Sequence, residues 1–237
     1  MLFFYIRHGD PIYSPDSLTP LGHAQANALA KRLALFGVDR VYASSSNRAM
    51  QTAEPTCELL KKEKTILDWA NEGHVWKEFT VKQEDGSLTW GFHDPETIEL
   101  FHSAEIRALG NRWFAHPKIP SRMAEGMARI DREVDAFFLS LGYRHDRENA
   151  RFEIVAPSEE RIALFAHQGF GLAFFSSLLD IPYPIFCTTF DIGHTGMSVV
   201  EFKSNGKYVY PKLLQLSNDS HLYREGILTG YHNRIRF

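Results

Sequence analysis

The chain has 237 residues, of which 44% are hydrophobic and 13% aromatic, enough apolar material for one large domain or two small ones. A formal net charge of −3 argues against a general nucleic-acid-binding protein, which usually carries a basic face. Cys57 and Cys187 have no paired spacing, so neither a disulfide framework nor a structural zinc site is expected. The apolar start is too short for a signal peptide and no later run reaches membrane-spanning length, so we expect a cytoplasmic protein.

The first chemical motif follows directly on an apolar segment. Residues 2–6 are apolar without a break and run into Arg7-His8-Gly9. A short continuous apolar run predicts a strand that is buried on both faces of a parallel sheet. In open α/β sheets, ligands bind outside the carboxyl ends of the strands, so we expect Arg7 and His8 at a ligand site. Gly9 would let the backbone turn sharply or approach another segment closely.

A capped helix is predicted next. Thr19 is a suitable N-cap and Pro20 suits the first helical position, where a missing N–H costs nothing. Apolar residues then recur at helical spacing from Leu21 to Phe36, and Gly37 provides a left-handed stop. We therefore expect a helix over residues 20–36.

A second motif follows a second predicted strand. Residues 38–43 read as a strand, and Ser44-Ser45-Ser46-Asn47 offers caps for a helix that begins near Arg48. Helix N-termini attract anions, and an arginine adds a planar fork suited to bidentate phosphate binding. We expect Arg48 to bind phosphate. Pro55 is expected to break or restart this helix, with residues 56–62 continuing it.

The middle of the chain, residues 73–156, carries no comparable motif. Apolar residues between Met123 and Leu141 alternate steps of four and three, which predicts a long helix with one buried face. We expect a largely helical insertion that covers the mouth of the site. The histidines of this segment lack metal-ligand spacing, so no metal is expected: His74, His93, His102, His116 and His145.

A third motif repeats the design of the first. Residues 161–166 read as a buried strand that ends in His167-Gln168-Gly169, and a helix over 170–179 follows. The backbone N–H after His167 is available to an anion.

The end of the chain predicts a hairpin. Strands over 195–202 and 207–216 would flank Asn205-Gly206, a strong turn signal. His194 precedes the first of these strands and is a candidate substrate contact.

Together these motifs resemble those of the histidine phosphatase superfamily, also called the phosphoglycerate-mutase-like proteins. The resemblance lies outside residues 73–156, and Gln168 replaces a commoner glycine. It rests on Arg7-His8-Gly9, Leu18-Thr19-x-x-Gly22-x-x-Gln25-Ala26, Ser44-Ser45-x-x-Arg48-Ala49-x-Gln51-Thr52-Ala53 and His167-x-Gly169. It implies a three-layer α/β/α fold with a mainly parallel sheet, in a single domain over 1–237 with a cap-like insertion at about 73–156.

The resemblance also implies covalent catalysis at His8. The phosphate would be bound by Arg7, His8, Arg48, His167 and Gln168, so that no metal or cofactor is needed. A carboxyl group would protonate the leaving alcohol, and Glu72 in Asn71-Glu72-Gly73 is the best match. Three nearby carboxylates remain rivals for that role: Asp68, Glu78 and Glu84.

The expected function is a metal-independent phosphomonoesterase that acts on a small phosphorylated metabolite through a phosphohistidine intermediate. One alternative is a phosphoglycerate-mutase-type phosphotransferase, but Asp10-Pro11-Ile12-Tyr13 departs from the polar stretch ending in Trp-Asn that such mutases carry. Another is a non-catalytic phospho-ligand-binding protein, although binding alone does not require a nucleophile. We expect no nucleic-acid or membrane partner, and a homodimer stays open.

Overall fold

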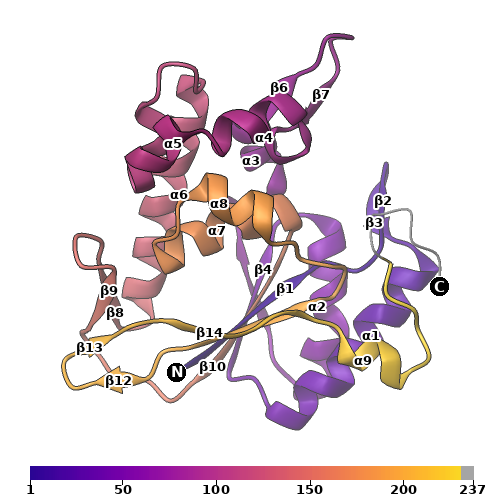
Figure 1. Ribbon diagram of the computed structural model, residues 1–237. Coiled ribbons are helices and arrows are strands. Elements are labelled where there is room, and N and C mark those ends of the chain that lie inside the picture. Colours follow the sequence, from indigo (N-terminus) through magenta and orange to yellow (C-terminus); the bar gives the residue numbers. More distant parts are fainter. Residues whose placement is uncertain (231–237) are drawn as a thin grey trace.

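The apolar run at the start of the chain forms a strand inside a twisted sheet with helices on both faces (Figure 1). The computed structural model describes residues 1–230; within them this sheet has six strands, β1 (Leu2–Arg7), β4 (Arg40–Ser44), β5 (Lys64–Leu67), β10 (Arg161–Ala166), β11 (Met197–Glu201) and β14 (Lys212–Asn218). Their order is β14-β11-β1-β10-β4-β5. In this order the four neighbours β1, β10, β4 and β5 pair in parallel, and only β11 among the six strands runs the opposite way. The predicted mainly parallel sheet is confirmed. The last residues of the predicted domain, 231–237, lie outside the described part.

Strand β1 contributes to two separate cores. Phe3 and Tyr5 belong to one hydrophobic cluster, whereas Phe4 and Ile6 belong to another, and all four are at most 1% exposed. Successive side chains of a strand point to opposite faces of the sheet, so an unbroken apolar run can fill both sides. The predicted three-layer arrangement is therefore confirmed.

One face of the sheet is covered by helices α1 (Pro20–Phe36), α2 (Asn47–Leu60) and α9 (Ser220–Arg224). The predicted caps of α1 are confirmed. Thr19 Oγ1 accepts a 3.0 Å hydrogen bond from the Gly22 N–H, and Gly37 ends the helix with a φ of 70°.

The expected break at Pro55 is wrong, because α2 continues through it. Proline removes one backbone hydrogen bond, but Ala49, Ala53 and Cys57 bury one face of this helix, and that packing holds the helix together on both sides of the proline.

The other face is covered by α6 (Ser121–Ser140) and α7 (Gln168–Leu179), against which α3 (Glu72–Phe79) and α8 (Tyr183–Thr189) pack. Phe137 and Phe138 of α6 place their ring centroids 6.1 and 5.3 Å from that of Phe3. The predicted long helix is thus part of the layer that packs on the sheet, although it lies within the expected insertion.

Residues 80–115 of the insertion gather at one end of the molecule, at the top of Figure 1. They form the short helices η2 (Gly91–His93), α4 (Pro95–Phe101), α5 (Ala104–Leu109) and η3 (Gly110–Ala115), with the hairpin of β6 (Thr80–Lys82) and β7 (Leu88–Trp90). A short helix, η1 (Asp68–Ala70), precedes α3. A further hairpin, β2 (Pro11–Tyr13) and β3 (Asp16–Leu18), follows the first motif. The helical insertion is confirmed, and its exact limits remain a prediction.

The predicted terminal hairpin is partly wrong. The long pair is β11 with β14, but the Asn205-Gly206 turn joins two short strands, β12 (Ser204–Asn205) and β13 (Tyr208–Val209). Of these, β13 pairs with β9 (Arg151–Ile154), which pairs with β8 (Tyr143–Asp146), so the four strands form a separate sheet. No helix within residues 1–230 is long and apolar enough to cross a bilayer.

Candidate active site

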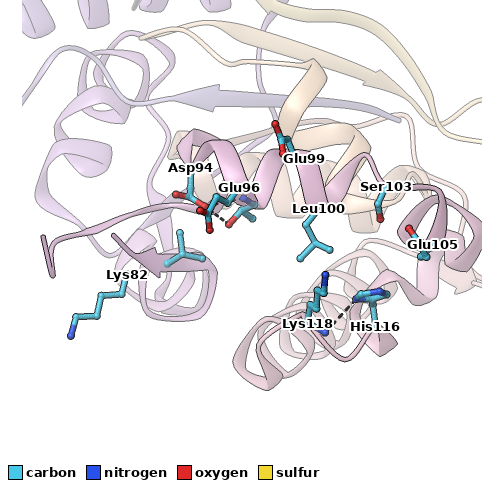
Figure 2. A pocket seen from close by; sticks show the side chains of 11 residues that line it. Lys82, Asp94, Glu96, Glu99, Leu100, Ser103, Glu105, His116 and Lys118 are labelled. Atoms are coloured by element: carbon cyan, nitrogen blue, oxygen red, sulfur yellow. Dashed lines mark hydrogen bonds between the residues drawn. The ribbon is translucent and has the colours of Figure 1, made fainter. Parts of the chain in front are cut away.

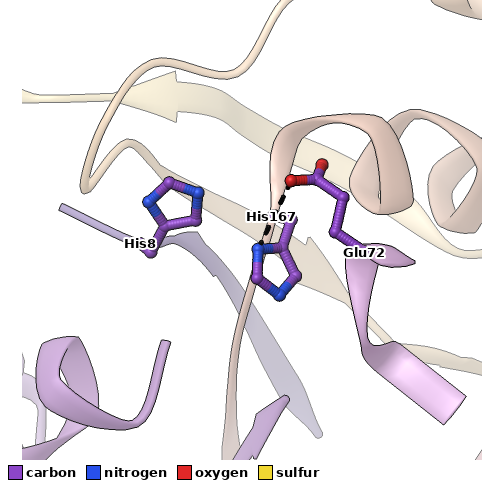
Figure 3. Close-up of side chains that lie close together, drawn as sticks. All are labelled: His8, Glu72 and His167. Carbon is purple, nitrogen blue, oxygen red and sulfur yellow. Dashed lines mark ion pairs between the residues drawn. The ribbon is translucent and has the colours of Figure 1, made fainter. Parts of the chain in front are cut away.

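The two motif histidines lie side by side at the carboxyl ends of neighbouring strands. Arg7 at the end of β1 is in register with Ala166 of β10, so the residues that follow both strands emerge together. The ring centroids of His8 and His167 are 5.1 Å apart, and both side chains are buried (Figure 3). The predicted meeting of His8 and His167 is confirmed.

The loop after β1 is packed against α1 through two glycines. A Cβ atom on Gly9 would lie 2.7 Å from the carbonyl oxygen of Gly22, and one on Gly22 would lie 2.2 Å from that of Asp10. Side chains at these positions would push the loop away from the helix. The Gly9 N–H also donates to Thr52 Oγ1 over 2.9 Å, which fixes the loop against α2.

A hydrogen bond to the neighbouring backbone fixes which nitrogen of the His8 ring carries the hydrogen. Nδ1 lies 2.7 Å from the carbonyl oxygen of Gly9. A carbonyl only accepts, so Nδ1 carries the hydrogen and Nε2 keeps its lone pair in the neutral ring. Burial lowers the pKa of His8 well below its usual value, and His167 and Arg7 lower it further, while the Gly9 carbonyl opposes them.

His167 is also held in one tautomer. Arg48 Nη2 lies 3.2 Å from its Nδ1, and a guanidinium only donates, so Nδ1 must accept. Nε2 then carries the hydrogen and donates to Ser44 Oγ over 2.8 Å, with Ser46 Oγ at 3.2 Å. Burial, followed by the charges of Arg48 and Arg7, lowers the pKa of His167 well below its usual value. Both histidines are therefore neutral in the folded protein near pH 7.

Arg7, which is buried, and Arg48, which is partly buried, supply the positive charge of the site. Arg7 Nη1 donates to the Ile192 carbonyl over 2.6 Å, and Arg48 Nη1 donates to Asp16 Oδ1 over 2.7 Å. Within residues 1–230, the Nε groups of Arg7 and Arg48 are buried and make no hydrogen bond. Buried donors of this kind are suited to an anion, which would satisfy them.

Glu72 is brought to the histidines by the start of α3. Asn71 caps this helix by accepting from the Gly73 N–H over 2.9 Å. Glu72 Oε2 lies 3.6 Å from His167 Nδ1 and 3.3 Å from Arg48 Nη2, and Figure 3 shows the carboxylate directed at the ring. The Glu72 side chain is thus within the site, as the sequence predicts.

The three rival carboxylates have other surroundings. Asp68 accepts from Ser45 Oγ, and its side chain is 79% exposed. Glu78 takes two 2.7 Å hydrogen bonds from the guanidinium of Arg129, and Glu84 is exposed in the turn between β6 and β7. Asp68 and Glu84 are thus exposed and Glu78 is paired with Arg129, whereas the Glu72 carboxylate lies beside His167.

The remaining predicted residues lie around this centre. The Gln168 side chain donates to Asp191. An anion could therefore accept from the backbone N–H of Gln168, which lies in the first turn of α7. The His194 ring centroid is 5.7 Å from that of His8, and its Nδ1 lies 3.6 Å from Asp10 Oδ1. The structure places His194 beside His8, and its contact with substrate remains a prediction.

Two residues outside the sequence motifs position the ends of β1 and β10. Tyr5 Oη donates to the His167 carbonyl over 2.6 Å and accepts from the His167 N–H over 3.3 Å. Thr195, whose φ is 52°, donates its N–H to the carbonyls of Arg7 and His8 at 3.1 and 3.2 Å. A hydroxyl in an apolar strand is the only sequence signal for Tyr5, and Thr195 has none.

Three of these side chains could also reach one metal ion. Across residues 1–230, the set of His, Cys, Asp and Glu ligand atoms close enough for this is His8, Glu72 and His167, within 4.8 Å of one another. A cation there would lie against Arg48, which contacts two of the three. Repulsion between like charges opposes metal binding and favours an anion.

A hollow in the insertion is distinct from this site. It has a volume of about 750 Å³ and is lined by carboxylates and lysines, as Figure 2 shows. Its carboxylates would repel a phosphate, so the site at the strand ends is the better candidate for phosphate chemistry. The labelled lining residues are Lys82, Asp94, Glu96, Glu99, Leu100, Ser103, Glu105, His116 and Lys118.

Comparison with known families decides which group this arrangement represents. The family model described as "Histidine phosphatase superfamily (branch 1)" matches residues 4–211. The chain belongs to this superfamily. That confirms the resemblance carried by the sequence motifs. Among curated proteins, none matches the sequence.

Solved structures share the fold at low sequence identity. A phosphoserine phosphatase variant from Entamoeba histolytica, in complex with phosphoserine, is 18% identical with a TM-score of 0.61, over 93% of this chain and 98% of that one. The same enzyme in complex with 3-phosphoglyceric acid is 19% identical with a TM-score of 0.60, over the same shares. A mycobacterial glucosyl-3-phosphoglycerate phosphatase in complex with VO3 is 18% identical with a TM-score of 0.58, over 91% of this chain and 98% of that one.

Proposed function

We propose that this member of the superfamily is a metal-independent phosphomonoesterase that forms a phosphohistidine at His8 and acts on a small phosphorylated metabolite. The observation that carries the proposal is the hydrogen bond from His8 Nδ1 to the Gly9 carbonyl. It leaves the lone pair of Nε2 free to attack phosphorus, in a ring whose lowered pKa keeps it neutral.

In the first step, His8 Nε2 attacks phosphorus and the bond from phosphorus to the leaving alcohol oxygen breaks. The Glu72 carboxyl gives its proton to that oxygen, so the alcohol departs neutral. Phosphorylated His8 then carries hydrogen on Nδ1 and phosphorus on Nε2, and the Gly9 carbonyl stabilises its positive charge. Arg7 and Arg48 offset the charge on the three equatorial oxygens.

In the second step, water attacks phosphorus and the bond to Nε2 breaks. The Glu72 carboxylate takes the proton of the water, which restores the acid for the next turnover. His8 returns to the neutral ring with hydrogen on Nδ1. Phosphate leaves, and no cofactor is required for either step.

Two observations favour hydrolysis over the alternatives. Pro11, Ile12 and Tyr13 form a strand of a hairpin, β2, where mutases carry a polar segment. The structural neighbours are named as phosphatases of phosphoserine and of glucosyl-3-phosphoglycerate, which supports a small phosphorylated metabolite as the substrate class. A purely binding role would not need a nucleophilic lone pair directed by a hydrogen bond.

The test is hydrolysis of a panel of phosphorylated metabolites and aryl phosphates by the purified protein in EDTA. We expect inorganic phosphate to be released at the same rate with and without EDTA. We expect no isomerised phosphoglycerate among the products. Loss of activity in EDTA with recovery in a divalent ion would contradict the metal-free mechanism. Phosphoglycerate isomerisation would identify a mutase, and the absence of any turnover would identify a binding protein.

A further inference from the structure

Two tryptophans of the insertion lie beside the proposed acid. Glu72 and Trp76 are four residues apart in α3, so their side chains share one face of the helix. Trp76 is 36% exposed, although its ring could bury a large apolar area in the core. An indole left partly exposed next to a catalytic carboxyl is available to contact whatever that carboxyl protonates.

Trp90 packs against Trp76 and lies over the first turn of α7. The two indoles meet edge to face, with centroids 4.8 Å apart at 90°, and Phe92 stacks on Trp90 at 5.3 Å and 14°. A Cβ atom on Gly169 would lie 2.5 Å from Cη2 of Trp90, so the indole lies directly over this glycine. The Gly169 N–H in turn donates to Glu72 Oε1 over 2.8 Å. Trp76 and Trp90 therefore flank Glu72 through α3 and α7 respectively.

The charges around the site disfavour an acidic leaving group. Arg7 and Arg48 are committed to the phosphoryl oxygens in the proposed mechanism, and His194 lies 3.6 Å from Asp10. Asp16 is itself paired with Arg48 over 2.7 Å. A leaving group with a second anion would find neither arginine available, whereas an uncharged ring needs no cation.

We infer that Trp76 and Trp90 form the leaving-group subsite and that it selects phosphate monoesters whose alcohol carries an uncharged aromatic ring. The inference rests on the proposed function, because the acid must touch the bridging oxygen. Side chains that flank Glu72 then touch the group attached to that oxygen. Edge-to-face and stacked contacts favour a planar ring over a puckered one of similar size.

The experiment compares benzyl phosphate with cyclohexylmethyl phosphate, which share the CH2–O–P linkage and differ in the planarity of the ring. For the unmodified protein, we expect kcat/KM to be higher for benzyl phosphate by about threefold to tenfold, the range that aromatic contacts supply. Trp76→Ala should bring the ratio of the two values close to one. Trp76→Phe should restore most of it.

Tyr210→Ala is the matched control, since Tyr210 is an aromatic residue that is 51% exposed and follows β13, in the sheet that β12 and β13 form with β9 and β8. It should keep the ratio of the unmodified protein. A ratio at or below one, or one that Trp76→Ala leaves unchanged while both esters are hydrolysed, would overturn the subsite and leave the proposed function standing. Failure to hydrolyse either ester or p-nitrophenyl phosphate would overturn the proposed function and the subsite together.

Discussion

Glu72 Oε1 accepts a 2.8 Å hydrogen bond from the backbone N–H of Gly169, which joins the first turn of α3 to the first turn of α7 across 97 residues of sequence. The contact holds a carboxylate from the edge of the insertion beside His167. The proposed acid and the first turn of α7, which follows His167, are therefore held in one geometry.

The Glu72→Gln variant should separate substrates by the quality of their leaving group. An amide cannot give up a proton, so esters of alkyl alcohols should lose much more kcat/KM than esters of nitrophenol, whose anion departs unaided. The comparison uses kcat/KM because the second step, in which Glu72 acts as base, is the same for both esters. Parallel assays of an alkyl phosphate and p-nitrophenyl phosphate would show the difference. Equal losses on both would remove Glu72 from the acid role and direct attention to Asp68, Glu78 or Glu84.

Arg48→Ala should raise KM and lower kcat together, because the guanidinium would hold phosphate in both the bound substrate and the transition state. We expect a loss of about 2–4 kcal/mol in transition-state stabilisation, as for removal of a charge-stabilising donor. Steady-state kinetics of Arg48→Ala and Arg48→Lys would measure it. Arg144→Ala is the control, since the Arg144 side chain is 61% exposed. Kinetics of Arg48→Ala that match this control would place Arg48 outside the phosphate site.

The pH dependence of kcat/KM should reflect the lowered pKa of His8. His8 attacks as the neutral ring, which is present above its pKa, and burial, His167 and Arg7 move that pKa well below its usual value of about 6.5. Activity should therefore persist on the acid side of pH 6.5. Measurement of kcat/KM at a series of pH values on both sides of pH 6.5 would test this. An acid limb centred near pH 6.5 would mean that His8 titrates as an exposed histidine.

His145 should make stability depend on pH in the opposite sense to a carboxylate. Burial opposes its charge, but Asp135 and Asp180, which lie 2.9 and 2.8 Å from Nδ1 and Nε2, outweigh burial and raise the pKa of His145, while the nearby Arg147 opposes them. A raised folded pKa contributes stability that is complete below about pH 6.5 and is lost as pH rises through the folded pKa.

Urea unfolding from about pH 6 to about pH 9 would measure this contribution. The free energy of unfolding should fall with rising pH in the unmodified protein, and the difference from His145→Asn should shrink over the same range. Asp131 also faces Arg147, so Asp131→Asn serves to separate its titration from that of His145. A difference between the unmodified protein and His145→Asn that stays constant with pH would show that folding does not raise the pKa of His145.

The parts of the site that sequence predicts are those encoded locally. The apolar run of residues 2–6 predicts a doubly buried strand, and the strand predicts where His8 emerges. The same pattern at residues 161–166 places His167. Because parallel strands end at the same edge, two local patterns are enough to bring the two histidines together.

The parts that sequence does not reveal are contacts between distant segments. Asp16 lies on a short hairpin, and its contact with Arg48 depends on how that hairpin folds over α2. Tyr5 reads as one more apolar residue of β1, and its hydroxyl finds the His167 backbone only after β1 pairs with β10. Thr195 adopts a positive φ that threonine rarely takes, because its N–H is bound to the carbonyls of Arg7 and His8.

The most direct test of the account is to trap the phosphorylated protein. A radiolabelled phosphate ester is mixed with excess protein and the reaction is stopped by alkaline denaturation, because the bond from phosphorus to histidine nitrogen survives base and hydrolyses in acid. We predict label on the unmodified protein and on His23→Ala, an exposed histidine of α1, and none on His8→Ala. Label on His8→Ala at the level of the unmodified protein would contradict the mechanism.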